Sequence, residues 1–306
     1  MYLAHFGLRE LPFNLTPDTS FFFADAIHQE ALNTLLVAVR NGEGFIKITG
    51  EVGTGKTLLC RQFLASINPD ASRGQGSFVT AYIPNPYLEP HTLLLAVAEE
   101  IGIRLDKDAN QYQLTKALTL ALLNFARAGK RVVLCLDEAQ ALPVETLDAI
   151  RLLSNLETGK RKLLQIVLFG QPELDVKLNQ AASRQLNQRI VFHHRLTPMK
   201  REDIEHYVAH RLGVARYTGG ELFTRAAIRQ LYDASGGIPR LVNIIAHKSL
   251  MLAYGEGVRQ ISARHVRTAA KDTETARHPR LRGWLWALAL GAVFAGAVFW
   301  WWRSMQ

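Results

Sequence analysis

Two kinds of apolar pattern alternate along the first two-thirds of the chain. Short continuous runs rich in β-branched and aromatic residues predict strands buried on both faces of a sheet. These runs lie at residues 44–49, 77–84, 131–142 and 163–174. Apolar residues spaced three and four positions apart predict helices at residues 57–67, 91–103, 111–129 and 144–157. The alternation predicts an α/β fold in which a parallel sheet lies between two helical layers.

The pattern changes near Thr197, where the strand-like runs stop. From there to about Glu274 the apolar spacing predicts helices only. Pro198 suits the beginning of a helix, Gly236 and the glycine after it break one helix, and Pro239 opens the next. This part of the chain therefore predicts a second, smaller helical domain.

An uncharged apolar segment, Trp284 to Trp302, lies near the C-terminus. At about 1.5 Å per residue it would span roughly 28 Å, which matches the hydrocarbon core of a bilayer. Tryptophans stand at both of its ends, as in the aromatic belts of membrane-spanning helices. The alternative is a buried core helix, but such helices seldom run this long without a charge. The segment therefore predicts one C-terminal transmembrane helix.

Positive charges flank this segment unequally. Arg303 alone follows it, whereas several basic residues precede it, namely Arg264, Arg267, Lys271, Arg277, Arg280 and Arg282. Because positive residues stay in the cytoplasm, we expect the preceding domains on the cytoplasmic side of the inner membrane. The arginines nearest the segment would also attract anionic lipid head groups. The expected parts are a core (1–196), a helical lid domain (197–275), a basic juxtamembrane linker (276–283), the transmembrane helix (284–302) and a short tail (303–306).

The composition bears on the kind of partner and on the cellular compartment. The net charge of +9 suits a nucleic-acid or an anionic-membrane partner and does not decide between them. Two cysteines, Cys60 and Cys135, lie in apolar runs and provide no disulfide framework. A reduced, cytosolic compartment is the simplest interpretation.

The candidate chemistry begins between the first predicted strand and the helix after it. Gly50 to Thr57 match G-x-x-x-x-G-K-[ST], and a strand and a helix stand on either side, as this phosphate-binding motif requires. Glycines let backbone N–H groups point at phosphate oxygens, and the helix N-terminus adds partial positive charge. The alternative is a glycine-rich turn that ends in Lys-Thr by chance.

Each residue of this loop has an expected role. Lys56 would bind the β- and γ-phosphates, and the Thr57 hydroxyl would ligate Mg²⁺. The residues expected to contact the nucleotide here are Gly50, Glu51, Val52, Gly53, Thr54, Gly55, Lys56, Thr57 and Leu58.

A second Mg²⁺ ligand is expected at the end of the third predicted strand. The apolar part of that run ends at Asp137 and Glu138. Ligands of open α/β sheets gather at the carboxyl ends of strands, so Asp137 would lie where the metal binds. Glu138 would orient or deprotonate an attacking water. The alternative is a pair of carboxylates that cap the next helix.

Three further side chains are candidates because of their positions. Gln171 follows the last predicted strand and would sense the γ-phosphate or hold the water; the alternative is a turn residue before Pro172. Arg184 and Arg189 would reach the nucleotide of a neighbouring subunit and stabilise the transferred phosphoryl group. The alternative for either arginine is a solvated basic face.

Together these motifs resemble the AAA+ branch of P-loop ATPases. The resemblance is carried by residues 50–57, Asp137-Glu138, Gln171, LNQRI (186–190) and GGIPRLVN (236–243). More narrowly, the opening MYLAHFGLRELPFNLTPDTSFFF, HQEAL and GEGFIKITGEVGTGKTLLCR are similar to the secretion-pathway ATPase group of general secretion pathway protein A (ExeA type) and MSHA pilus biogenesis protein MshM. The similarity extends over roughly residues 1–270.

The resemblance implies a five-stranded parallel sheet with a helical lid. Arg240 would be the sensor-2 arginine of the lid, and Gln171 the sensor-1 residue. Arg189 would be the trans-acting arginine finger, with Arg184 the weaker candidate. A finger that acts between subunits implies a homo-oligomeric, hexameric ring. Residues 6–16 would lie against adenine and ribose.

The expected function is that of a membrane-anchored AAA+ ATPase of the inner membrane. It would hydrolyse ATP, with Mg²⁺, to drive or regulate assembly of a type IV (MSHA-like) pilus or a type II secretion machine. Its partners would be copies of itself, inner-membrane assembly proteins and membrane lipid. Larger members of the group continue into a peptidoglycan-binding domain, and the end of this chain at Gln306 favours the pilus-biogenesis members.

The alternative function is that of a DNA-binding AAA+ ATPase of the transposition or partition-helper type. Much of the excess charge lies beside the membrane segment, and no basic stripe interleaved with aromatics stands out, so nucleic acid is the less favoured partner. The sequence contains neither an LSGGQ-like stretch of transporter ATPases nor an N-K-x-D guanine-reading motif.

Overall fold

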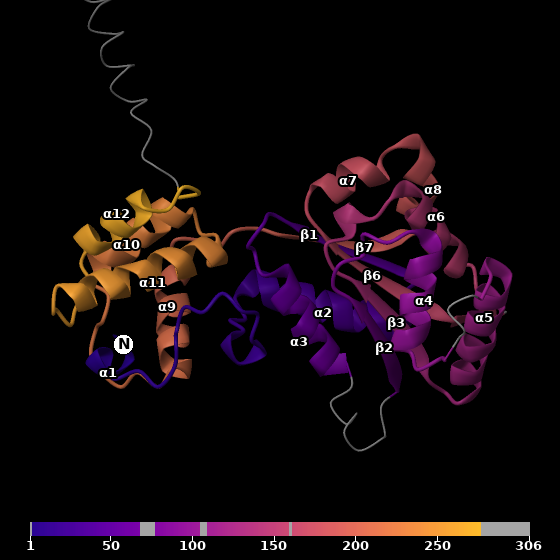
Figure 1. The fold of residues 1–306 in the computed structure, drawn as a ribbon, viewed down its shortest axis with the longest axis horizontal. Coiled ribbons are helices and arrows are strands. Elements are labelled where there is room, and N and C mark those ends of the chain that lie inside the picture. Colours follow the sequence, from indigo (N-terminus) through magenta and orange to yellow (C-terminus); the bar gives the residue numbers. More distant parts are fainter. Residues whose placement is uncertain (1, 68–76, 105–108, 159–160, 277–306) are drawn as a thin grey trace, which may run out of the picture.

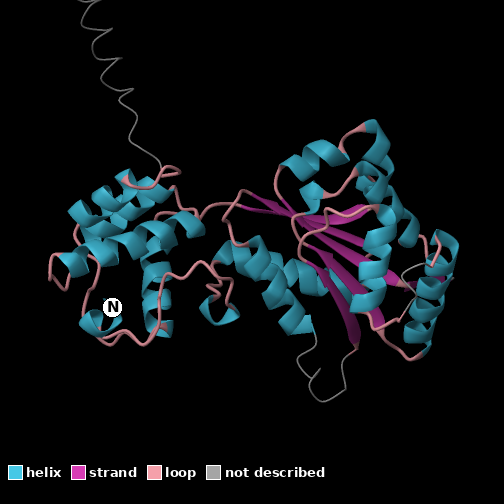
Figure 2. Cartoon of the chain, viewed as in Figure 1, coloured by secondary structure: helices cyan, strands magenta, loops and turns pink. Residues whose placement is uncertain are grey.

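The computed structural model describes residues 2–67, 77–104, 109–158 and 161–276, which form two parts (Figure 1). One part contains a sheet between helices, and the other contains helices (Figure 2). The expected α/β fold with a helical lid is confirmed.

Five parallel strands make the central sheet, as the resemblance implied. They are β1 (Phe45–Gly50), β2 (Phe78–Ile83), β3 (Arg131–Leu136), β6 (Leu164–Gly170) and β7 (Ile190–Leu196). The strand order is β2-β3-β6-β1-β7, and the pairing is parallel throughout. All residues of β1 and β6 are buried, because helices cover both faces. Parallel pairing brings the carboxyl ends of β1 and β3 to the same edge.

Helices cover the two faces unequally (Figure 1). One face packs on α2 (Ala26–Asn41) and α3 (Lys56–Ile67) through Ile46, Ile48 and their neighbours. The helices on the other face are α4 (Pro90–Glu100), α5 (Gln111–Arg127), α6 (Val144–Leu153), α7 (Glu173–Leu178) and α8 (Arg184–Asn187). Alternate residues of each strand face opposite layers, so both layers share the same strands. Cys60 and Cys135 are free and buried in the first layer.

The apolar pattern alone missed β7 and the helices α2, α7 and α8, and it misplaced the end of one helix and the start of another. β7 is an edge strand, as β2 is, and most of its residues alternate between half-buried and exposed positions instead of forming an apolar run. The helix expected at 144–157 ends at Leu153, because a short antiparallel hairpin of β4 (Glu157–Thr158) and β5 (Arg161–Lys162) follows. The helix expected near Pro198 begins at Asp203.

Four helices form the lid domain, and they are α9 (Asp203–Val214), α10 (Arg225–Ser235), α11 (Pro239–Gly255) and α12 (Ala263–Lys271). The two glycines between α10 and α11 are required there. Gly236 ends α10 in the left-handed conformation, with φ of 60°. A Cβ on Gly237 would lie 2.1 Å from the carbonyl oxygen of Met199. The Met199 N–H donates to the Gly237 carbonyl at 2.9 Å, which holds the chain before α9 extended against this turn.

The N-terminal segment packs on the lid. The helix α1 (Tyr2–Phe6) and the residues Leu8 and Phe13 belong to the buried cluster of the lid helices. The expected boundary placed all of residues 1–196 in the core. The packing instead joins residues 2–13 to the lid, because their aromatic side chains fill its hydrophobic interior.

The C-terminal parts fall mostly outside the described residues. Of the expected linker at 276–283, the structure describes Ala276, and the expected transmembrane helix at 284–302 and tail at 303–306 lie beyond it. Within the described ranges, no helix has the length and apolar character needed to cross a membrane.

Candidate active site

The loop between β1 and α3, residues 51–55, has a backbone that glycine alone permits at key points. Gly53 and Gly55 have φ of 82° and 95°. A Cβ on Gly53 would lie 2.6 Å from Cβ of Arg240, and one on Gly50 would lie 2.8 Å from Oγ1 of Thr54. The glycines therefore fix a tight loop against the lid, as the motif predicts.

Lys56 begins α3 and is buried inside this loop. Its Nζ donates to the carbonyl oxygens of Gly50 at 2.7 Å and Glu51 at 3.0 Å. Burial lowers the pKa of Lys56, while the nearby carboxylates of Glu138 and Asp137 act in the opposite direction. A partly desolvated ammonium held by neutral carbonyls is an attractive site for phosphate oxygens.

Thr57 and Asp137 meet across the sheet edge, as expected for a shared metal site. The Thr57 hydroxyl donates to Oδ2 of Asp137 at 2.6 Å, and Asp137 is 2% exposed. Burial raises the pKa of Asp137, despite the hydrogen bonds from the Thr57 hydroxyl and the Glu138 N–H. A hydroxyl and a desolvated carboxylate are oxygen ligands of the kind that Mg²⁺ takes, and a cation would offset the cost of burying this charge. The residues present therefore fit a magnesium ion.

Glu138 is held by two amide side chains. Its Oε2 accepts hydrogen bonds from Nε2 of Gln140 and from Nε2 of Gln171, the latter at 3.0 Å. Oε1 of Gln140 also accepts from the backbone N–H of Gln171 at 3.0 Å. The φ of Glu138 is 52°, a strained value for a residue with a side chain. Gln171 thus lies beside Glu138, and its expected sensing role stays a prediction.

Sequence reasoning did not identify Gln140. It lies in the short turn Ala139–Ala141 that follows Glu138. The sequence offered one indication of a role for Gln140, which is its position two residues after Glu138 and shortly after the end of β3. That signal is weak, because most polar residues in such turns face solvent.

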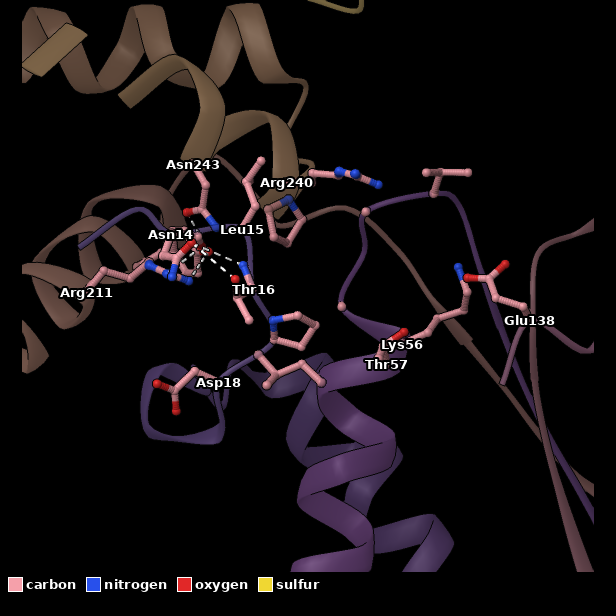
Figure 3. A pocket seen from close by; sticks show the side chains of 17 residues that line it. Asn14, Leu15, Thr16, Asp18, Lys56, Thr57, Glu138, Arg211, Arg240 and Asn243 are labelled. Atoms are coloured by element: carbon pink, nitrogen blue, oxygen red, sulfur yellow. Dashed lines mark hydrogen bonds between the residues drawn. The ribbon is translucent and has the colours of Figure 1, made fainter. Parts of the chain in front are cut away.

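Lys56, Thr57 and Glu138 border a pocket of ≈ 350 Å³ that both parts of the protein line (Figure 3). Lys56 and Glu138 face each other on one side of it, and Asn14, Arg211 and Asn243 gather on the other. Its volume falls in the range of small-molecule sites. The lining residues are Asn14, Leu15, Thr16, Pro17, Asp18, Val52, Gly53, Gly55, Lys56, Thr57, Leu58, Glu138, Tyr207, Arg211, Pro239, Arg240 and Asn243.

Arg240, the second residue of α11, is in the predicted position. Its backbone N–H donates to the Gly53 carbonyl at 3.2 Å, and its side chain lines the pocket. The lid and the loop therefore meet directly at the pocket.

The lid side of the pocket depends on Arg211, which sequence reasoning also missed. Arg211 is buried in α9 and donates through Nε to the Pro12 carbonyl and through Nη2 to the Asn14 carbonyl at 3.1 Å. Its guanidinium stacks 4.6 Å from the Phe21 ring centroid. One arginine thus fastens the N-terminal segment to the lid.

The segment expected against adenine and ribose is only partly at the pocket. Asn14 to Thr16 line it, and Oδ1 of Asn14 accepts from the Thr16 N–H at 3.3 Å. Phe6 and Phe13, in contrast, are buried in the lid cluster. The expectation for residues 6–16 is therefore corrected to the last three, because the aromatic residues are used as lid core.

The two candidate arginine fingers lie away from the pocket of their own chain. Arg189 donates through Nη1 to the Ser154 hydroxyl at 2.9 Å and to the Asn155 side chain, beyond the end of α6. Arg184 is exposed at the start of α8. Action on a neighbouring subunit stays a prediction for both.

The chain is similar to known proteins at the level of sequence. A family described as "AAA domain" matches residues 39–178. General secretion pathway protein A of Aeromonas hydrophila is 39% identical over 305 residues, which is 99% of this chain and 54% of that protein. The chain therefore spans about half the length of this curated relative.

The structure is similar to solved AAA-type folds. Cdc6p of Pyrobaculum aerophilum matches with a TM-score of 0.65 and 18% identity, over 85% of this chain and 70% of that chain. The ORC1 protein of Aeropyrum pernix in complex with DNA gives 0.64 and 17%, over 87% and 70%. The RuvB branch migration motor of Thermotoga maritima gives 0.52 and 14%, over 82% and 70%. At these identities the likeness concerns the fold.

Proposed function

Because this chain is an AAA-domain protein homologous to general secretion pathway protein A, we propose that it hydrolyses ATP to ADP and phosphate and so drives or regulates assembly of a secretion or pilus machine. The observation that carries the proposal is that Lys56, Thr57 and Glu138 line one pocket, with Asp137 hydrogen-bonded to Thr57 beside it. The P-loop and the AAA fold by themselves support nucleotide binding.

Binding begins with the loop and its lysine. The N–H groups of the loop and the ammonium of Lys56 would hold the β- and γ-phosphates. Lys56 would then exchange its carbonyl partners for phosphate oxygens. Thr57 and Asp137 would hold Mg²⁺, which when bound neutralises charge on the phosphates.

Glu138 would accept the proton of the attacking water. Gln140 and Gln171 support this role because both donate to Oε2, which fixes the position of the carboxylate. Gln171 follows β6, so a γ-phosphate that draws its amide away would also change the position of the base. This arrangement supports the sensor-1 assignment of Gln171.

The lid and a neighbouring subunit would complete the site. Arg240 would contact the phosphates as the sensor-2 residue, and its place beside Gly53 supports this. Arg189, or else Arg184, would enter from the next subunit of a hexameric ring and stabilise the phosphoryl group.

The proposed place of action is the cytoplasmic face of the inner membrane. The uncharged segment from Trp284 to Trp302 would span the bilayer once, and the basic residues before it support a cytoplasmic ATPase. The partners would be inner-membrane proteins of a type II secretion machine or an MSHA-like type IV pilus, together with lipid. The homology to general secretion pathway protein A supports the secretion context.

The test is ATP hydrolysis by the full chain and by Glu138→Gln. We expect Glu138→Gln to retain ATP binding and to lose hydrolysis by about 10²- to 10⁴-fold, because it lacks the base but keeps the shape. Glu145→Gln is the matched control, since Glu145 is exposed at the start of α6 and lies outside the pocket. Hydrolysis by Glu138→Gln at the normal rate would show that another group is the base. Absence of hydrolysis in the unaltered chain would refute the proposed activity.

A further inference from the structure

His28 lies under the phosphate-binding loop and has no part in the proposed mechanism. It is in the first turn of α2 and is 6% exposed. Asp25, the residue that caps this helix, is buried beside it. The buried ring contacts the loop at the Thr54 carbonyl.

Both ring nitrogens of His28 face hydrogen-bond acceptors. Nδ1 lies 2.7 Å from Oδ1 of Asp25, and Nε2 lies 2.9 Å from the carbonyl oxygen of Thr54. A backbone carbonyl accepts and does not donate, so Nε2 is the donor in the contact with Thr54. Burial opposes the ionisation of Asp25, but the hydrogen bonds from His28 outweigh it and lower the pKa of the carboxyl. The two side chains are thus buried together, and the ring reaches the loop.

The contact with Thr54 determines which way a loop peptide faces. No peptide bond in the described residues is cis, so the Thr54 carbonyl and the Gly55 N–H point in opposite directions. The carbonyl points at His28, and the N–H of Gly55 therefore points away from it. Gly55 lines the pocket. The ring also lies close against the loop, since a Cβ on Gly55 would be 3.0 Å from Nε2.

The other hydrogen bonds of this part of the loop do not involve the peptide bond between Thr54 and Gly55. The Thr54 hydroxyl donates to the Glu51 carbonyl at 2.8 Å, which closes the loop on itself. The N–H of Arg240 holds the Gly53 carbonyl, one peptide earlier. Among the described residues, the Thr54 carbonyl receives its hydrogen bond from His28.

We infer that His28 is a positioning residue, which holds the Thr54 carbonyl so that the N–H of Gly55 is aimed at the β-phosphate of the bound nucleotide. This inference rests on the proposed nucleotide binding and adds a residue to it. His28 would contribute by orienting the loop. A loop peptide that already faces the phosphate site loses less conformational entropy when the nucleotide binds.

Two substitutions separate the two ends of the ring. His28→Gln can place an amide N–H near the position of Nε2, and so it retains a donor for the Thr54 carbonyl. His28→Asn can place its amide near the position of Nδ1, and so it retains the contact with Asp25 and loses the loop. Each variant keeps one buried contact and loses the other, so their effects on folding are closely matched.

The measurement is the affinity of the full chain for ADP, which has the β-phosphate and is not hydrolysed. We expect His28→Asn to weaken ADP binding about tenfold, as the loss of one buried hydrogen bond does, and His28→Gln to remain within about threefold of the unaltered chain. Melting temperatures of the three proteins serve as the check on folding.

Each other outcome has a definite meaning. Equal ADP affinity in His28→Asn and the unaltered chain would overturn the inference alone. Equal weakening in the two variants would also overturn it, because the loss of affinity would then not follow the loss of the loop contact. If the unaltered chain binds no ADP, the proposed nucleotide binding fails and the inference fails with it.

A second measurement on the unaltered chain does not depend on the folding of a variant. In NMR spectra, Nε2 of His28 should carry a proton, and ADP should shift the amide proton of Gly55 downfield as it gains a phosphate acceptor. An unprotonated Nε2, or an unshifted Gly55 amide, would contradict the assigned role.

Discussion

The two sides of the pocket are built in different ways. The phosphate side consists of one short loop and one strand end, and its chemistry lies in residues such as Lys56 and Asp137 that are buried in the core. The lid side joins Asn14 to Arg211, which are 197 positions apart. The phosphate loop is thus shaped by local backbone and meets Asp137 through the pairing of the sheet, whereas the lid side depends on the packing of the N-terminal segment against a separate domain.

The two sides of the pocket therefore also differ in the kind of side chain that forms them. Side chains on the phosphate side are desolvated charges, as the lowered pKa of Lys56 and the raised pKa of Asp137 indicate. The lid side is held by hydrogen bonds of Arg211 to backbone carbonyls and by aromatic packing. We therefore expect substitutions on the phosphate side to affect hydrolysis, and substitutions on the lid side to affect stability and affinity.

The largest effect is expected when Arg211 is replaced, because the lid side of the pocket depends on it. Arg211→Ala leaves the carbonyls of Pro12 and Asn14 without their donor and should destabilise the protein by about 3 kcal/mol. ADP affinity should fall about tenfold, because the N-terminal side of the pocket is released, while the hydrolysis rate at saturating ATP stays within about threefold. Unfolding by denaturant, calorimetry and steady-state kinetics measure the three quantities.

The control for Arg211 is Arg201→Ala on the same domain. Arg201 forms an exposed ion pair with Asp233, and such pairs contribute at most about 1 kcal/mol. If Arg211→Ala behaves like Arg201→Ala in stability and affinity, the lid side does not depend on this arginine.

A smaller effect on stability is expected on the phosphate side, at Asp137. Burial raises the pKa of Asp137 above its ordinary value of 3.8, so the folded state favours the protonated carboxyl. The stability contributed by this group is therefore lost as pH rises from the ordinary value through the raised one. Asp137→Asn does not titrate, and without nucleotide it should be more stable than the unaltered chain at neutral pH, by on the order of 1 kcal/mol.

The measurement for Asp137 is urea unfolding over a pH series. The advantage of Asp137→Asn should shrink as the pH falls through the raised pKa of the carboxyl and vanish below the ordinary value, while Mg²⁺-dependent hydrolysis is lost at all pH values. Asp148→Asn is the control, because Asp148 is half-exposed and pairs with Arg151 at the surface. If Asp137→Asn is less stable than the unaltered chain at neutral pH, burial of the Asp137 carboxylate does not destabilise the fold.

The same contrast determines what the sequence could predict. The phosphate side was predicted because its motif is contiguous and its strands are unbroken apolar runs. The edge strand β7 was missed because half of its positions face outward. Gln140 and His28 were missed because their partners are identified only when the turn after β3 and the first turn of α2 are placed in space.

The lid side illustrates a further limit. Arg211 is one of many arginines in a basic chain, and nothing in its local sequence distinguishes a buried one. Phe6 and Phe13 were expected near the nucleotide and lie in the lid core, because an aromatic residue in a short segment fits either role until its packing is known. Contacts between distant segments therefore required the structure.

The most direct test of the central claim is calorimetry of Mg²⁺-ATP binding to the full chain and to Lys56→Ala. The account predicts one site per chain, and a loss of at least about 100-fold in affinity for Lys56→Ala, since a desolvated, charge-assisted contact to the phosphates is removed. Lys130→Ala, at an exposed position after α5, should bind as the unaltered chain does. No binding by the unaltered chain in the presence of Mg²⁺, or equal affinity in Lys56→Ala, would contradict the claim that a triphosphate is held between this loop and the end of β3.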